Sequence, residues 1–232
     1  MLKKVCKAAF PHTIPVLMGY LFLGMAFGIL LESKGFHTGW ALLMGTTIYA
    51  GSMQFVGTSI LAVAMSFGQT AIVTLLVNAR HLFYGLSMIE KYKDTGKVKP
   101  YLIFALTDET YSLVSTLTPP EDIPRKWFYF FISLFNQLYW IVGCVLGTLI
   151  GGILPFVPEG IEFVMTALFV VIAVEQWCFT KKHIPAITGF IVSGICLILF
   201  GAENFLIPSM IGIIVVLSIG RRHLEGGKEN GA

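Results

Sequence analysis

Residues 69–89 read QTAIVTLLVNARHLFYGLSMI, a stretch that is almost entirely apolar but carries Asn78, Arg80 and His81 near its centre. About 20 predominantly apolar residues are needed to cross a bilayer as a helix, and this run has that length. A charged side chain at the centre of such a helix costs about 2.5–3.5 kcal/mol on insertion scales, so it must face another polar group or a cavity. The stretch therefore predicts a membrane-spanning helix with a functional site at its middle.

The remainder of the chain is equally apolar. Hydrophobic residues make up 56% of its 232 residues and charged residues 12%, and the mean hydropathy is +0.79. An average soluble domain has about 25% charged residues. We therefore expect an integral membrane protein in which residues 1–232 form a single transmembrane domain. The net charge of +3 is typical of a membrane protein with basic cytoplasmic ends, and it gives no indication of nucleic-acid binding.

Eight apolar runs are separated by short polar segments, and the basic residues in those segments constrain the orientation of the runs. The loop at residues 90–99 carries four lysines and is the most basic in the chain. Cytoplasmic loops are enriched in lysine and arginine. If all eight runs crossed the membrane from a cytoplasmic N-terminus, this loop would lie outside. The runs are at about 14–31, 40–65, 69–89, 101–118, 127–150, 161–179, 185–200 and 205–219.

Two re-entrant hairpins restore the expected charge distribution. The run at 40–65 is predicted to enter and leave on one side of the membrane, with a break near Ala50-Gly51-Ser52, and the run at 161–179 to do so from the other side. A hairpin arm of about 10 residues reaches half of a ~30 Å hydrocarbon core. We therefore expect a multi-pass protein of the cell membrane (inner or plasma membrane) with a cytoplasmic N-terminus. The basic residues at 91–99, 181–182 and 221–222 are then also cytoplasmic, and Arg125-Lys126 lies outside.

A glycine motif occurs twice, as GMAFG at residues 24–28 and as GCVLG at residues 143–147, with an offset of 119 residues. With the charge distribution, this offset predicts an inverted repeat, with halves at about 11–118 and about 127–220. Each half would have three spans and one re-entrant hairpin, as in many secondary transporters. The alternative is that each motif only lets its helix pack closely against a neighbour. The predicted fold class is an all-α integral membrane protein, a polytopic helical bundle.

Charged residues in two neighbouring runs are expected to pair within the membrane. One run carries Arg80 and His81, the next carries Asp108 and Glu109, and the short loop between the runs holds them at similar depth. Pairing Arg80 with either carboxylate offsets much of the cost of burying the two charges. One arginine cannot neutralise two carboxylates, so the spare carboxylate is a candidate for proton coupling or for binding an ammonium group. His81 is either a further relay member or a histidine held by helix packing.

The breaks of the two hairpins are candidate substrate sites. A break in a membrane helix frees backbone N–H and C=O groups that must bind something. Helix N-termini suit a carboxylate, and freed carbonyls with an acidic side chain suit an ammonium group. The alternative is that Gly51 and Ser52 only kink a helix. Gln54 would then bond across to one of two polar mid-membrane residues, Asn136 and Gln137. The candidate substrate-binding residues are Gly51, Ser52, Gln54, Phe55, Asn78, Glu175 and Gln176.

The sequence has no pattern for catalysis, for a metal or for a nucleotide. It lacks an HExxH zinc motif, a GxxxxGK[ST] nucleotide-binding loop and a repeated arginine ladder. We therefore expect no enzyme activity, no cofactor and no metal site. The four cysteines have neither paired nor metal-ligand spacing, and we expect them to serve as packing residues. They are Cys6, Cys144, Cys178 and Cys196.

Four polar motifs and a glycine-rich first span carry a resemblance to a known family. The motifs are TIYAGSMQF at 47–55, NARHLFYG at 78–85, TDET at 107–110 and NQLYW at 136–140. With these motifs in this order, the chain resembles the AzlC family of branched-chain amino acid permeases over essentially its whole length.

The resemblance implies export of leucine, isoleucine, valine and their analogues. We therefore expect a secondary transporter that works by alternating access, driven by a proton or solute gradient because the sequence has no nucleotide-binding loop. The implied partners are the amino-acid substrate, membrane lipid and a small AzlD-like membrane subunit. Two alternatives remain, a selective channel and a transporter of another small solute. A third, a structural subunit whose transport site lies elsewhere, is disfavoured by the acidic residues Asp108, Glu109 and Glu175 in apolar runs.

Overall fold

The computed structural model describes residues 2–63, 65–154 and 183–225, together with single positions between 160 and 178. The described residues form helices and connecting segments without strands, which confirms the predicted all-α fold class. The chain divides into two compact units, Met1–Thr166 and Ala167–Ala232. Glu175, Gln176 and most of the hairpin predicted at 161–179 lie outside the described residues.

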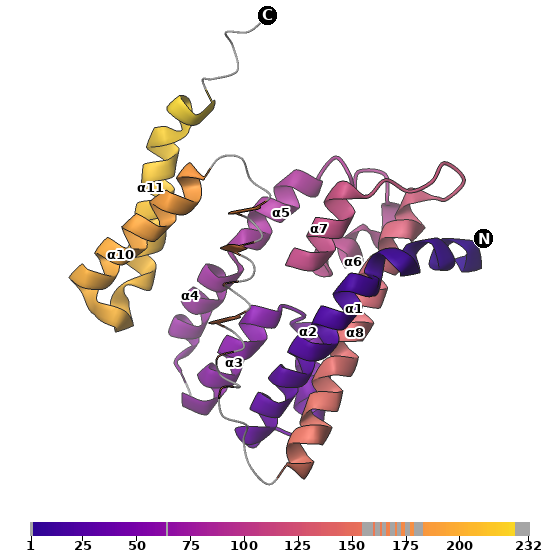
Figure 1. Ribbon diagram of the computed structural model, residues 1–232, viewed down its shortest axis with the longest axis horizontal. Coiled ribbons are helices and arrows are strands. Elements are labelled where there is room, and N and C mark those ends of the chain that lie inside the picture. The colour runs from indigo at the N-terminus through magenta and orange to yellow at the C-terminus, as the bar shows by residue number, and fades with distance from the viewer. Residues whose placement is uncertain are drawn as a thin grey trace, which may run out of the picture. The chain divides into compact units, whose positions relative to one another are not determined.

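Two long helices run side by side through the first unit (Figure 1). They are α1, Leu2–Ser33, and α8, Arg125–Ile153. Their backbones meet at the two glycine motifs. A Cβ on Gly28 would lie 2.2 Å from the carbonyl oxygen of Cys144, and one on Gly147 would lie 2.2 Å from the carbonyl oxygen of the facing Met25. Small residues at this spacing permit so close an approach. The two motifs therefore form one helix–helix contact.

These two helices are parallel. Lys4 at the start of α1 pairs with Asp122 just before α8. At the other end, a Cβ on Gly151 of α8 would lie 3.1 Å from the Cβ of Glu32 of α1. In an inverted repeat of the predicted halves, their first spans would be antiparallel. That prediction is wrong for this pair, as is the placement of Arg125-Lys126 opposite the N-terminus. The motifs match in spacing because they face each other across one contact.

The first hairpin consists of α2, Thr38–Thr47, and α3, Gly51–Val63. α2 begins near the C-terminal end of α8, where Thr148 Oγ1 donates to Thr38 Oγ1 at 3.1 Å. α3 returns along α2, since a Cβ on Gly57 would lie 3.3 Å from Met44 Cε. The predicted helix break within 40–65 is therefore confirmed. Its central residue is Tyr49, which has a φ of +43°.

A bent helix pair follows the first hairpin. It consists of α4, Phe67–Asn78, and α5, Arg80–Met88. The apolar parts of the two helices meet at 48° and together are long enough for one membrane span. The bend lies at Asn78-Ala79, where the amide of Asn78 donates to Thr74 O at 3.0 Å. This bend places the most polar part of the run inside the bundle.

A second hairpin occupies residues 96–116, where a plain span was predicted for 101–118. Its elements are the 3₁₀ helix η1, Gly96–Val98, then α6, Lys99–Phe104, and α7, Asp108–Thr116. Leu102 of α6 and Val114 of α7 pack in one buried cluster with Tyr92, so the hairpin enters and leaves at the same end. The span prediction is wrong because Thr107 caps a new helix. Its hydroxyl accepts from the backbone N–H of Thr110, and a capped N-terminus starts α7 in a new direction.

Basic residues gather at one end of the first unit. Val5 of α1, Tyr92 and Ile123 pack in one cluster, so the segments that carry them end at the same level. Lys34 follows the other end of α1. The positive charge of the unit is therefore segregated. The residues at the basic end are Lys3, Lys4, Lys7, Lys91, Lys93, Lys97, Lys99, Arg125 and Lys126.

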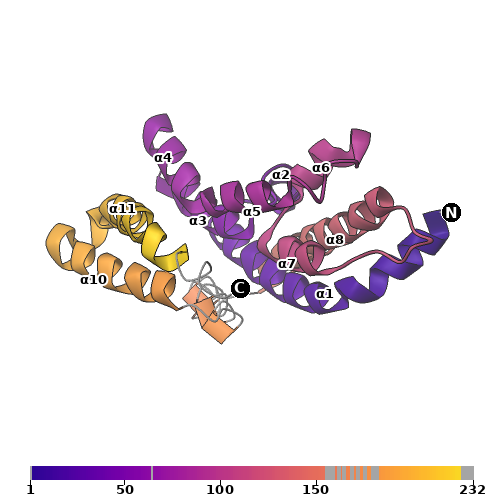
Figure 2. The same ribbon diagram turned by 90° about the horizontal axis from the view of Figure 1, so that it is seen from above.

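The second unit contains a helix pair, α10, Ile184–Asn204, and α11, Leu206–Glu225, which lie side by side in both views (Figures 1 and 2). They pack closely where a Cβ on Gly212 would lie 2.9 Å from Val192 Cγ1. Among the described residues, three helices are long and apolar enough to cross a membrane, or four with the bent pair. They are Leu2–Ser33, Arg125–Ile153 and Ile184–Gly201.

Candidate functional site

The two hairpins of the first unit approach from opposite ends and meet near its middle. Tyr49, at the break of the first hairpin, packs against Phe104 at the break of the second, with ring centroids 6.2 Å apart. Tyr20, in the middle of α1, bonds to Thr107 at the start of α7. The returning helices α3 and α7 thus both begin inside the bundle. The first N–H groups of a helix have no partner within it, so these two ends bring partial positive charge to the centre.

Arg80 joins the starts of the two returning helices. Its Nη1 lies 2.8 Å from Asp108 Oδ2 on α7, and its Nη2 donates to Ser52 Oγ on α3 at 2.6 Å. The side chains of Arg80 and Asp108 are 25% and 18% exposed. Of the two carboxylates that the sequence offered to Arg80, Asp108 is the partner. One guanidinium therefore connects both hairpins.

Several polar atoms beside this ion pair lack a partner in the described part of the chain. They include Arg80 Nε, Asp108 Oδ1 and Asn78 Oδ1, each of which is buried. A buried polar atom left unpaired costs about 1–3 kcal/mol. One donor and two acceptors are therefore available to a polar ligand.

Glu109 points away from the ion pair and toward α1. The hydroxyl of Tyr20 donates to Glu109 Oε2 at 2.7 Å and lies 2.6 Å from Thr107 Oγ1. Thr107 in turn lies 3.0 Å from the Oγ1 of Thr110, which accepts from the amide of Asn136 at 3.0 Å. Glu109 is thus at the end of a chain of hydroxyl groups.

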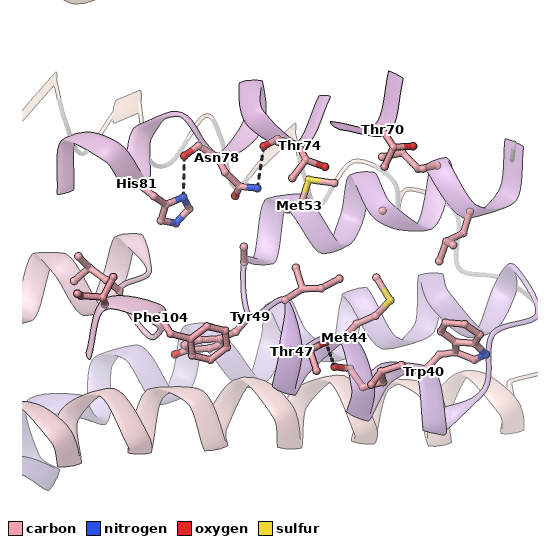
Figure 3. A pocket seen from close by; sticks show the side chains of 18 residues that line it. Trp40, Met44, Thr47, Tyr49, Met53, Thr70, Thr74, Asn78, His81 and Phe104 are labelled. Carbon is pink, nitrogen blue, oxygen red and sulfur yellow. Dashed lines mark hydrogen bonds between the residues drawn. The ribbon is translucent and has the colours of Figure 1, made fainter. Parts of the chain in front are cut away.

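A cavity of about 650 Å³ lies between the first hairpin, the bent helix pair and the break of the second hairpin (Figure 3). Asn78 and His81 reach it from the bend, opposite Tyr49 and Phe104. Ligand pockets are typically about 300–1,000 Å³ and mostly apolar. This cavity therefore suits a small solute with an apolar part. Its lining residues are Trp40, Leu43, Met44, Thr47, Ile48, Tyr49, Ala50, Met53, Gly57, Ile60, Leu61, Thr70, Thr74, Asn78, His81, Ile103, Phe104 and Leu106.

Tyr49 sits at this cavity in a strained conformation. A positive φ in a bulky residue is uncommon and costs about 1–2 kcal/mol. The side chain is buried, and its hydroxyl is among the unpaired polar atoms. Such strain persists where the surrounding structure enforces it, and it clusters at functional sites. Tyr49 separates the cavity from the buried core of the unit.

Three of the predicted substrate residues pack toward α1 or α8 and do not line the cavity. Gln54 accepts from the indole N–H of Trp140 at 2.8 Å, where Asn136 or Gln137 was the expected alternative partner. A Cβ on Gly51 would lie 3.1 Å from the same indole ring. Phe55 packs against Phe27, with ring centroids 5.5 Å apart. Among the predicted substrate residues, the described cavity is lined only by Asn78.

The two predicted mid-membrane amides do not line the cavity. Asn136 bonds to Thr110, whereas Gln137 accepts from the hydroxyl of Tyr101 at 2.8 Å. His81 does line the cavity, and its Nδ1 lies 3.2 Å from Asn78 O. The structure therefore brings Asn78, Arg80, His81 and Asp108 together, and separates them from Gln54 and Phe55.

Sequence reasoning missed Tyr20 and the capping role of Thr107. Threonine followed by two acidic residues is a helix-start signal, and it could have revealed the break at Thr107. Tyr20 lies within a long apolar run without any local signal. Its role follows only from the packing of α1 against α7.

The AzlC protein family model matches residues 15–154. A branched-chain amino acid transport protein, AzlC of Bacillus subtilis, is 48% identical over 219 residues, which cover 94% of this chain and 86% of that protein. Membrane proteins of Helicobacter pylori and Haemophilus influenzae are 45% and 40% identical, and the matches cover 96% of this chain and 97% and 91% of those proteins. No solved structure matches the chain.

Proposed function

The chain belongs to the AzlC family of membrane proteins, and we propose that it transports branched-chain amino acids through the cavity between its hairpins. The observation that carries this proposal is a large apolar cavity with a charged pair and unpaired polar atoms beside it. The aliphatic side chain of the substrate needs an apolar cavity, and its zwitterionic backbone needs charged and polar partners. The Bacillus subtilis relative is a branched-chain amino acid transport protein, which supports the same substrate class and a function without enzyme activity.

The zwitterion is proposed to bind at the bend of α4 and α5. Its carboxylate would be bound by Arg80 Nε and by free N–H groups at the start of α3. Its ammonium group would be bound by the unpaired oxygens of Asn78 and Asp108. Met53 and Phe104 would contact the side chain from two elements. Charge-assisted hydrogen bonds of this kind are the strong ones, so they fix orientation while the apolar lining selects the side chain.

Alternating access is proposed to use the two hairpins as gates. One hairpin enters from the basic end of the unit and the other from the opposite end, and Arg80 bonds to both. Moving either hairpin breaks its bond to Arg80 and opens the centre toward one side. Export of amino acids, with a small AzlD-like membrane subunit as partner, is proposed from the resemblance described above.

The test is counterflow of labelled leucine in proteoliposomes, with and without an AzlD-like subunit, followed by efflux from preloaded cells. The variant Gly57→Leu should lower leucine exchange while sparing smaller solutes such as alanine. Its side chain would enter the cavity beside Met44. A contact of one methylene changes discrimination by about 10–200-fold.

Gly68→Leu is the matched control, because nothing lies within 4 Å of a Cβ at that position and Gly68 does not line the cavity. Equal leucine and alanine ratios in Gly57→Leu and Gly68→Leu would exclude the cavity as the side-chain site. Absence of counterflow in the wild-type protein would reject the transport function.

The basic end of the first unit is proposed to be cytoplasmic, including the N-terminus, because cytoplasmic segments are rich in lysine and arginine. In a variant whose native cysteines are replaced, Lys126→Cys should be shielded from an impermeant thiol reagent in whole cells. Gly39→Cys, at the other end, should react. Both positions are exposed. Labelling of Lys126→Cys from outside would contradict this topology.

A further inference from the structure

Glu109 has no cationic partner among the described residues. The adjacent Asp108 forms the ion pair with Arg80, whereas Glu109 accepts a hydrogen bond from the hydroxyl of Tyr20 at 2.7 Å. Arg80 is thereby already neutralised. A second carboxylate at the same depth leaves one negative charge without compensation, and such a charge is expensive in an apolar interior. Taking up one proton removes it.

The hydroxyl chain that starts at Glu109 can accommodate both charge states without moving a heavy atom. When Glu109 is ionised, Tyr20 donates to its Oε2, and Tyr20 accepts from Thr107. When Glu109 is protonated, its O–H donates to Tyr20, which donates to Thr107, which donates to Thr110 over 3.0 Å. A hydroxyl is one donor and also an acceptor, so the hydroxyls of Tyr20 and Thr107 can each donate one hydrogen bond in either pattern. A fixed ion pair has no such freedom.

The charged and titratable groups facing this cluster come from three directions. Tyr20 faces it from α1, and Tyr49 from the break of the first hairpin. Tyr84 faces it from α5. Asp108 and Arg80 stand beside it as a neutral pair. Tyrosines remain neutral at ordinary pH. Glu109 is therefore the one group of this described cluster whose charge can change without breaking an ion pair.

We propose that Glu109 carries the proton that couples a pH gradient to amino-acid transport, with Tyr20 as a positioning residue. The inference rests on the proposed function, and it adds the coupling ion and the residue that holds it. A proton binds to the carboxylate of Glu109 while the centre is open to one side, and is released to water when the centre opens to the other. The Arg80–Asp108 pair stays charged throughout and serves the substrate.

The experiment uses the full chain in proteoliposomes with leucine, and separates exchange from gradient-driven movement. Counterflow needs no net proton movement, whereas accumulation against a concentration gradient does. Glu109→Gln, which is permanently neutral, should keep counterflow and lose all stimulation by an imposed pH gradient. Glu109→Asp should recover the stimulation. Glu90→Gln, at an exposed loop carboxylate, is the control and should behave as the wild type.

Tyr20→Phe removes the hydroxyl but keeps the ring that packs against Trp140. If Tyr20 positions the proton-binding group, this variant should shift the pH profile of leucine transport while leaving protein abundance unchanged. A purely structural role would lower abundance and leave the profile in place.

Each outcome decides for or against the inference. Gradient-driven accumulation that persists in Glu109→Gln would overturn it, as would a wild-type protein that exchanges leucine but ignores the pH gradient. No counterflow in the wild type would instead reject the transport function. A second measurement does not depend on Glu109→Gln reaching the membrane. Leucine added to weakly buffered wild-type vesicles should move protons, and an unchanged pH during leucine uptake would also overturn the inference.

Discussion

Replacing Gly147 with alanine is expected to separate α1 from α8 and to remove most of the folded protein from the membrane. The added Cβ would lie 2.2 Å from the carbonyl oxygen of Met25 and 2.7 Å from its Cα, both of which are backbone atoms that cannot turn aside. Overpacking in a well-packed core costs about 1–3 kcal/mol even where side chains can move. A clash with backbone at two helices should reach or exceed the upper end. Gly28→Ala should have the same effect, because its Cβ meets Cys144 O at 2.2 Å.

Gly19→Ala is the matched control on α1. Nothing lies within 4 Å of a Cβ there, and alanine favours a helix over glycine by about 1 kcal/mol. Thermal unfolding of detergent-solubilised protein should therefore show a large loss for Gly147→Ala and no loss for Gly19→Ala. Equal melting temperatures for Gly147→Ala and Gly19→Ala would contradict a close backbone contact between α1 and α8.

The second large effect is expected at Arg80. Arg80→Ala leaves Asp108 as an uncompensated charge and removes the bond to Ser52. Removing one partner of a buried ion pair costs about 3–5 kcal/mol, because the other charge stays buried. We expect very low abundance of the variant in membranes and no leucine transport.

Double variants distinguish the two carboxylates. Arg80→Ala with Asp108→Asn should recover abundance but not transport, since the pair is neutralised while the proposed substrate groups are lost. Arg80→Ala with Glu109→Gln should not recover abundance, because Glu109 bonds to Tyr20 and not to the guanidinium. Immunoblots of membrane fractions, with leucine counterflow, measure both. If Glu109→Gln restored the abundance of Arg80→Ala and Asp108→Asn did not, the partner of Arg80 would be Glu109 and not Asp108.

The sequence by itself determined the class of the protein. A long apolar run inside a bilayer must form a helix, because only a helix satisfies the backbone hydrogen bonds of the run within the run itself. The break in residues 40–65 also followed from the sequence, since the parity of the basic loops required a hairpin and Gly51-Ser52 supplied a place for it. The need for Arg80 to find a carboxylate followed from the cost of an unpaired charge.

Only the tertiary structure decided which groups meet. Residues 101–118 are apolar and long enough for a span, and the prediction relied on that length. The Thr107 cap, a local helix-start signal, instead turns the chain back at that point. The choice between Asp108 and Glu109 depends on the rotation of α7, because adjacent residues on a helix point about 100° apart. The direction of α8 relative to α1 depends on which segments between them cross the unit and which turn back as hairpins. Helical periodicity does not encode that difference. The two glycine motifs are identical in spacing for either direction, and the backbone contact between them is formed by parallel helices.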